Sequence, residues 1–285
     1  MVSIIGLIIV AAGVIGGFMA EGGKLLTLYQ PAEFIIIGGA MIGSLLAATS
    51  LSNLKKMIAQ LSDVITPGMS KEDYLDVMVM MFELFNVARK DGLIALEKHV
   101  ENPESSSVFK RYPKFESNHH AVAFLCDTLR MVITGTAQTH ELESLMDTDI
   151  ESHHEELERA PTIITKVGDA MPGFGIVAAV LGVVLTMGAI GGPPEEIGHK
   201  VGAALVGTFL GVLSAYGFIL PIATNLSFAN TDRSKIYECM KQGLLAFQKG
   251  IAGVMAVEFA RRALPGDMRP SFQELEDACN KARMR

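Results

Sequence analysis

Residues 201–231 read VGAALVGTFLGVLSAYGFILPIATNLSFANT, a run without one acidic or basic side chain. Three further uncharged and apolar runs lie at residues 2–20, 34–54 and 170–194. Each run is long enough to cross the hydrocarbon core of a bilayer as a helix, which takes about 20 residues. The sequence therefore predicts an all-α membrane protein with four transmembrane helices.

The charged residues gather between the second and third runs and after the fourth run. We assign the transmembrane helices to 1–20, 32–51, 169–192 and 200–223, a large helical cytoplasmic domain to 52–168 and a helical cytoplasmic tail to 224–285. Apolar spacing and breaks predict further helices at 71–90, 97–100, 106–109, 121–133, 140–159 and 235–263. Ser271 and Glu274 have the spacing of a capping box at another helix start.

The basic residues predict the orientation. Of 24 Lys and Arg, residues 51–169 hold twelve and residues 232–285 hold ten, which leaves Lys24 and Lys200 in the two short loops. The positive-inside rule therefore places both termini, the large domain and the tail in the cytoplasm. The first run lacks the basic start of a signal peptide and is longer than the usual apolar core, so we expect a retained span.

Several function classes are disfavoured. The net charge of −7 does not suit nucleic acid, which needs a basic face. No P-loop, Ser-His-Asp, HExxH or CxxC constellation stands out, which argues against an enzyme. The pairs His119-His120 and His153-His154 have side chains that point apart on a helix, so we expect solvated histidines and no metal site.

The polar groups of the spans are hydroxyls. Thr186 and Thr208 either bond back to carbonyls of their own helices or help to line an ion path. A proton carrier needs Asp, Glu or His, and the uncharged runs contain none. We therefore expect the conducting carboxylate to lie on another chain.

Prolines and glycines also mark the spans. Pro172 and Pro221 lie near the predicted cytoplasmic ends of the third and fourth spans. They are either ordinary helix-end prolines or a paired hinge, since proline removes a helix hydrogen bond. The GxxxG motifs at 39–43 and 207–211 favour tight packing against partners, because small residues let helix backbones approach closely in lipid.

Long stretches of the chain resemble the MotA family of flagellar motor stator subunits. They include VGDAMPGFGIVAAVLG at 167–182, VGAALVGTFLGVLSAYGFILP at 201–221 and ARKDGLIALE at 88–97. The tail motifs AVEFARR at 256–262 and RPSFQELE at 269–276 are also similar to that family. The resemblance runs from the first span to the tail.

This resemblance implies a homopentamer around a dimer of a MotB-like partner, in the bacterial inner membrane. The partner would supply the conducting Asp, and ion flux would drive torque on the rotor protein FliG. Pro172 and Pro221 match prolines that couple ion passage to movement, and Thr208 matches a pore-lining threonine. Arg89 and Glu97 match the charged pair that engages FliG, although alone they read as solvated surface residues.

The resemblance also bears on the ion. Ala179 stands where sodium-type relatives carry threonine, which favours protons over sodium, and we expect no other cofactor. The candidate ion-pathway and coupling residues are Pro172, Ala179, Thr186, Thr208 and Pro221. The main alternative is an ExbB/TolQ-type energiser, although such proteins usually have three spans. A secondary transporter with its own substrate site and a passive membrane scaffold are further alternatives.

Overall fold

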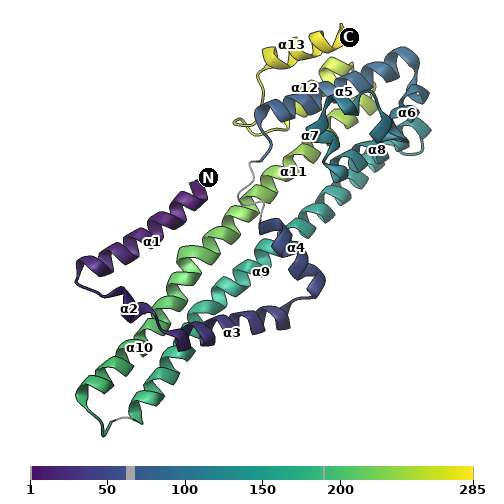
Figure 1. Ribbon diagram of the computed structural model, residues 1–285. Helices are drawn as coiled ribbons and strands as arrows, with labels where there is room; N and C mark the ends of the chain where they lie inside the picture. Colours follow the sequence, from purple (N-terminus) through teal and green to yellow (C-terminus); the bar gives the residue numbers. More distant parts are fainter. Residues whose placement is uncertain (1, 62–67, 189, 285) are drawn as a thin grey trace. The chain divides into compact units, whose positions relative to one another are not determined.

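The computed structural model describes residues 2–61, 68–188 and 190–284. Within these ranges every regular element is a helix (Figure 1). The chain divides into two compact units. Unit 1 comprises Met1–Thr66 and Leu157–Ala229, and unit 2 comprises Pro67–Glu156 and Asn230–Arg285.

The helices follow one another along the chain in a fixed order. They are α1 (Val2–Ala20), α2 (Leu25–Leu28), α3 (Pro31–Ala48), α4 (Leu51–Leu61), α5 (Lys71–Asp91), η2 (Leu93–Leu96), α6 (Glu97–Val100), η3 (Pro103–Ser105), η4 (Phe109–Arg111), α7 (Pro113–Glu116), α8 (His119–Thr134), α9 (Thr139–Met187), α10 (Pro194–Val212), η5 (Leu213–Ile219), α11 (Leu220–Gln248), α12 (Gly253–Arg262) and α13 (Phe272–Arg283). Of the short η elements, η5 is a π-helix and the others are 3₁₀-helices.

Four helical stretches within the described residues are long and apolar enough to cross a membrane. They are Val2–Ala20, Leu25–Ala48, Thr139–Met187 and Pro194–Gln248. The predicted all-α chain with four membrane-crossing helices agrees with this finding. Because α9 and α11 continue beyond the apolar segments, their ends do not mark a membrane boundary, and the predicted span limits stay predictions.

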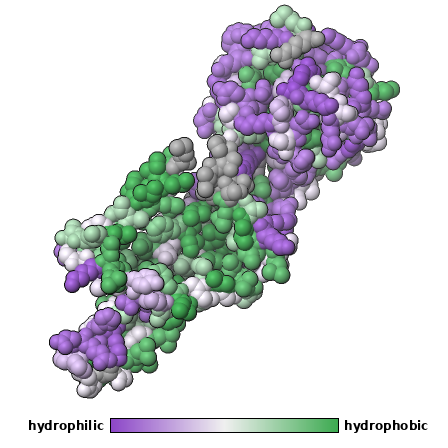
Figure 2. Space-filling model, in the orientation of Figure 1, coloured by the Kyte–Doolittle hydropathy of each residue, from purple (hydrophilic) through white to green (hydrophobic). Residues whose placement is uncertain are grey.

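The surface of unit 1 is apolar. Helix α1 has no buried residue, and Leu185 of α9 is 70% exposed. Figure 2 shows mainly hydrophobic residues over the visible face of unit 1, apart from a hydrophilic tip, and mainly hydrophilic residues over that of unit 2. A water-soluble protein rarely exposes so large an apolar surface, so lipid or other subunits must cover unit 1.

Helix α5 supplies much of the core of unit 2. Its side chains Tyr74, Met78, Phe82 and Phe85 are buried. The ring of Phe85 stacks on Phe247 of α11 with 4.3 Å between the centroids. The helix predicted over 71–90 is confirmed by α5, since its apolar period faces this core.

The capping box predicted at Ser271 and Glu274 is confirmed. The Ser271 hydroxyl accepts from the Glu274 N–H at 3.2 Å, and the Glu274 carboxylate accepts from the Ser271 N–H at 2.5 Å. This capping box starts α13 as predicted. Such a motif needs only residues three apart, so the sequence contains all of it.

The single tail helix predicted over 235–263 is wrong. The chain breaks between α11 and α12, where Gly250 has a φ of 78°. The Gly250 N–H donates to the Phe247 carbonyl at 2.9 Å, and the Ile251 N–H donates to the Ala246 carbonyl at 3.1 Å. This is a Schellman ending, which glycine adopts without strain.

The helix predicted over 106–109 is also wrong, because the short 3₁₀-helix η4 begins only at Phe109. The Ser106 hydroxyl accepts from the N–H groups of Val108 and Phe109 at 3.2 and 3.3 Å. Serine therefore acts before the turn as a local acceptor, a role that competes with helix formation.

Candidate functional site

Helices α9 and α10 touch through their backbones. A Cβ atom built on Gly175 would lie 2.8 Å from the Gly207 carbonyl oxygen and 3.1 Å from the Gly211 Cα. One built on Gly211 would lie 2.7 Å from the Met171 carbonyl oxygen. Real Cβ atoms essentially never approach within 3.0 Å, so this contact, here called the α9–α10 seam, requires glycine on both helices.

The seam continues at Gly182, where a Cβ atom would lie 2.6 Å from the Ala204 Cβ. The tight packing predicted for the GxxxG motif at 207–211 is thus present, but inside the chain. By contrast, a Cβ atom on Gly39 or Gly43 of α3 would meet nothing within 4 Å. The motif at 39–43 is therefore open in the isolated chain.

The two candidate hinge prolines belong to neighbouring turns. Pro172 lies inside α9, and Pro221 lies in the first turn of α11, directly after the π-helix η5. Each proline removes the donor for a carbonyl four residues earlier, at Gly168 and Gly217, and a π turn accommodates such a misfit. A Cβ atom on Gly168 would lie 2.7 Å from the Leu220 side chain, so the two interruptions pack together.

The other candidate pathway residues differ in their surroundings. Thr208 is half-buried in the seam, and its Cα would lie 3.3 Å from a Cβ atom on Gly175. Thr186 is buried, and its hydroxyl donates to the Gly182 carbonyl at 2.8 Å. Ala179 is half-buried on α9. The seam therefore presents Thr208, whereas the Thr186 hydroxyl is satisfied by its own helix.

One buried acidic side chain lies in the second predicted span, 32–51, and sequence reasoning assigned it no role. Helix α3 begins at Pro31, so Glu33 falls in its first turn, where it is 6% exposed. The prediction that the spans hold no Asp, Glu or His is therefore wrong. Pro31 was the available signal, because proline favours the first helical position.

The candidate rotor-interacting residues flank a sharp turn in unit 2. Arg89 lies in the last turn of α5, Glu97 begins α6, and both are exposed. Gly92 turns the chain between them with a φ of 87°. Leu93 and Ile94 follow, with Ile94 75% exposed. Two opposite charges thus border an exposed apolar pair.

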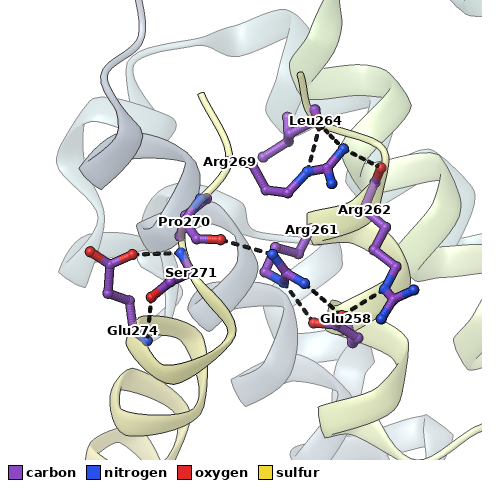
Figure 3. A network of polar contacts seen from close by, with 8 residues as sticks. All are labelled: Glu258, Arg261, Arg262, Leu264, Arg269, Pro270, Ser271 and Glu274. Carbon is purple, nitrogen blue, oxygen red and sulfur yellow. Dashed lines mark hydrogen bonds and ion pairs between the residues drawn. The ribbon is translucent and has the colours of Figure 1, made fainter. Parts of the chain in front are cut away.

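The tail motifs form a polar network that folds the C-terminus (Figure 3). Buried Glu258 accepts from Arg261 at 2.7 Å and from Arg262 at 2.8 Å. Arg261 also donates to the Pro270 carbonyl at 2.9 Å. Hydrogen bonds from Arg261 and then Arg262 lower the pKa of Glu258 to about 2. These motifs therefore have a structural role at the approach to α13.

Two of the four paired histidines, His120 and His153, are half-buried and stack on each other, so the prediction of solvated histidines is wrong for these two. The rings of His120 on α8 and His153 on α9 stack with 3.7 Å between their centroids. Tyr237 of α11 lies edge-on to both rings, at 5.2 and 5.1 Å. Burial, and then the neighbouring His120, lowers the pKa of His153. Across the described residues, no group of three or more His, Cys, Asp or Glu is placed to hold a metal ion.

Comparisons with known proteins cover nearly the whole chain. The family model "Motility protein A N-terminal" matches residues 4–92, and that of the "MotA/TolQ/ExbB proton channel family" matches residues 116–238. Motility protein A of Escherichia coli (strain K12) is 40% identical over 278 residues, which cover 97% of this chain and 94% of that protein.

Solved structures share the fold. The structure of C. jejuni MotAB gives a TM-score of 0.76 at 20% identity, covering 93% of this chain and 96% of that chain. The flagellar MotAB stator complex from Bacillus subtilis gives 0.72 at 24% identity, covering 90% and 92%. The resemblance read from the sequence is confirmed, and this chain belongs to the motility protein A family of flagellar stator subunits.

Proposed function

We propose that this chain forms a homopentamer around a dimer of a MotB-like partner, whose Asp conducts the ion. The apolar surface of unit 1 supports such an assembly, because it must be covered. The open glycines Gly39 and Gly43 give another helix room for close backbone approach. The role is that of an ion channel rather than an enzyme, in keeping with its family.

The proposed place of the assembly is the bacterial inner membrane, with both termini and unit 2 in the cytoplasm. Every Lys and Arg except Lys24 and Lys200 lies in residues 51–169 or 232–285. This distribution supports the orientation through the positive-inside rule.

The proposed ion is the proton. Ala179 offers no side-chain oxygen, and the Thr186 hydroxyl is already bonded to Gly182. A hard cation such as sodium needs several oxygen ligands in place of its water. Ala179 supplies none, and Thr186 supplies at most its single hydroxyl oxygen. A proton needs only one acceptor at a time.

The packing of the two proline turns is the observation that carries the proposed coupling. One charge that crosses 100 mV releases about 2.3 kcal/mol, which is comparable to one or two net hydrogen bonds. Helices α9 and α11, which already lack a hydrogen bond at Pro172 and at Pro221, can change their angle within that limit. Protonation of the partner's Asp would weaken its contact with the α9–α10 wall, and the ring would then shift.

The proposed contact with FliG is the surface around Arg89 and Glu97. Both charges are exposed, and Leu93 and Ile94 between them give an apolar centre with a charged rim, a common interface pattern. Movement of the ring would carry this surface against the rotor.

The first test is swimming of a stator-deleted bacterium that expresses this chain with its cognate MotB-like partner, with and without sodium. Rescue in both media supports a proton-driven stator. Rescue only with sodium would overturn the ion assignment. Failure to swim despite membrane insertion and partner binding would favour the ExbB/TolQ-type alternative.

The hinge is tested with Pro172→Ala, and Pro161→Ala in the same helix is its matched control. We expect the first variant to bind the partner normally but to swim poorly, while the second swims like the parent. An unimpaired Pro172→Ala swimmer would count against the hinge.

The rotor contact is tested by charge reversal. Arg89→Glu should abolish torque while leaving ion flux intact, and Lys90→Glu, at the exposed neighbour, serves as the control. Equal losses in the two variants would argue for a general effect of charge rather than a specific contact.

A further inference from the structure

A buried acid of α3 lies beside the α9–α10 seam, and the proposed coupling does not use it. Three Glu side chains are buried among the described residues: Glu33, Glu83 and Glu258. Arg111 pairs with Glu83 at 2.7 Å, and Arg261 pairs with Glu258 at 2.7 Å. Glu33 has no such ion pair, and its Oε2 atom is buried without a hydrogen-bond partner.

The place of this carboxyl group depends on a glycine. A Cβ atom built on Gly207 of α10 would lie 2.5 Å from Glu33 Oε2 and 3.2 Å from its carboxyl carbon. The same atom would lie 3.1 Å from the Ala178 Cβ of α9. The Glu33 carboxyl group therefore lies against the backbone of α10 at Gly207, where α10 meets α9. Thr208 is the next residue in the sequence.

The helices around Glu33 offer no nearby charge. On α10 the titratable residues Glu195, Glu196, His199 and Lys200 all lie in its first two turns. Even Lys200 is about 10 Å from Gly207 along the helix axis, and it is paired with Glu196 at 2.9 Å.

The other neighbouring elements carry few titratable groups. On α9, the nearest titratable residue to Ala178 in the chain is Asp169, about 13 Å away along the axis. Helix α2, which packs on α10, has no titratable side chain, although the exposed Lys24 directly precedes it. The exposed Tyr216 belongs to η5, and α3 has no titratable residue besides Glu33.

An ionised carboxylate in such a place loses its hydration without gaining a cation, which is strongly unfavourable. Taking up a proton removes that cost. Gly207 and the Ala178 methyl group, which lie beside this carboxyl group, bring no side-chain oxygen, whereas a metal cation needs several oxygen ligands. The site therefore suits a proton.

We propose that Glu33 is a proton-binding site of this chain, a relay group in the ion pathway beside the α9–α10 seam. This inference rests on the proposed function and deepens it. A proton that arrives from the side of the short loop before α3 forms an O–H bond at Glu33 Oε2. That bond breaks when the proton passes to the next acceptor toward the partner's Asp, and the carboxylate is ready again.

The test uses the purified complex of the full chain with its cognate MotB-like partner. Infrared spectroscopy at neutral pH should show the C=O stretch of a protonated carboxyl group that Glu33→Gln removes. In liposomes, Glu33→Gln should lower proton flux about a hundredfold or more, the scale of a lost proton-transfer group. Glu33→Asp, which keeps a carboxyl group, should retain more flux than Glu33→Gln.

Controls separate this inference from the proposed function. Parent complexes that conduct no protons would refute the proposed function itself. A conducting parent with unchanged flux in Glu33→Gln, or without the infrared change, would overturn the relay. Equal flux in the Gln and Asp variants would also overturn it, since shape rather than proton binding would then matter. Size-exclusion chromatography with the partner confirms that each variant assembles.

Discussion

Substitution of Gly175 by alanine tests the α9–α10 seam directly. The new methyl group would lie 2.8, 3.1 and 3.3 Å from backbone atoms of Gly207, Gly211 and Thr208. None of these atoms can rotate away, so α9 and α10 must separate by roughly half an ångström to reach ordinary contact. Overpacking of this kind costs about 1–3 kcal/mol.

Gly173→Ala is the matched control. It lies on the same helix, and a Cβ atom there meets nothing within 4 Å. Both variants gain the higher helix propensity of alanine, which is about 1 kcal/mol, so the difference between them reports the seam alone.

Two measurements decide the outcome. Unfolding of the purified chain in mixed micelles should show Gly175→Ala less stable than Gly173→Ala by about 1–3 kcal/mol. In soft agar, Gly175→Ala should also spread less. Equal stability and equal spreading of the two variants would refute the seam as a close backbone contact.

Three further outcomes are expected. The pKa of Glu258 falls from 4.5 to about 2 on folding. Ionised Glu258 therefore stabilises the fold fully above pH 4.5, and this stabilisation, about 3 kcal/mol, is lost as the pH falls toward 2. Acid melts of Glu258→Gln should lack this pH dependence. The lowered pKa of His153 means that its stabilisation is full above 6.5 and declines as the pH falls below that value; His153→Phe should remain stacked and lose this decline in circular dichroism melts. Thr208→Val should reduce proton flux more than Thr186→Val, whose hydroxyl serves only its own helix, and the reverse order in liposome flux would contradict the seam assignment.

Much of the fold could be predicted because its signals are local. The uncharged runs, the apolar period of α5 and the capping box at Ser271 each involve neighbours along one helix. Gly250 was overlooked because the apolar pattern resumes on its far side. A glycine between two periodic segments deserved to be read as a possible helix end.

The site was harder to predict because its contacts join distant residues. The GxxxG motif marked Gly207 as a packing position but did not reveal Gly175 or Glu33 as its neighbours. The stack of His120 on His153 likewise depends on how α8 and α9 pack. Glu33 lies inside the predicted span 32–51, but the expectation about a conducting acid considered only the uncharged run 34–54, which begins one residue after it.

The glycines of unit 1 fall into two groups, one crowded within the single chain and one open. A side chain at Gly175 or Gly211 collides within one molecule, so mutants there should already be defective as isolated chains. A Cβ atom at Gly39 or Gly43 meets nothing within 4 Å in the single chain. Any defect at these open positions must therefore arise when another surface arrives, and scanning them with bulky residues would map the neighbours of each subunit genetically.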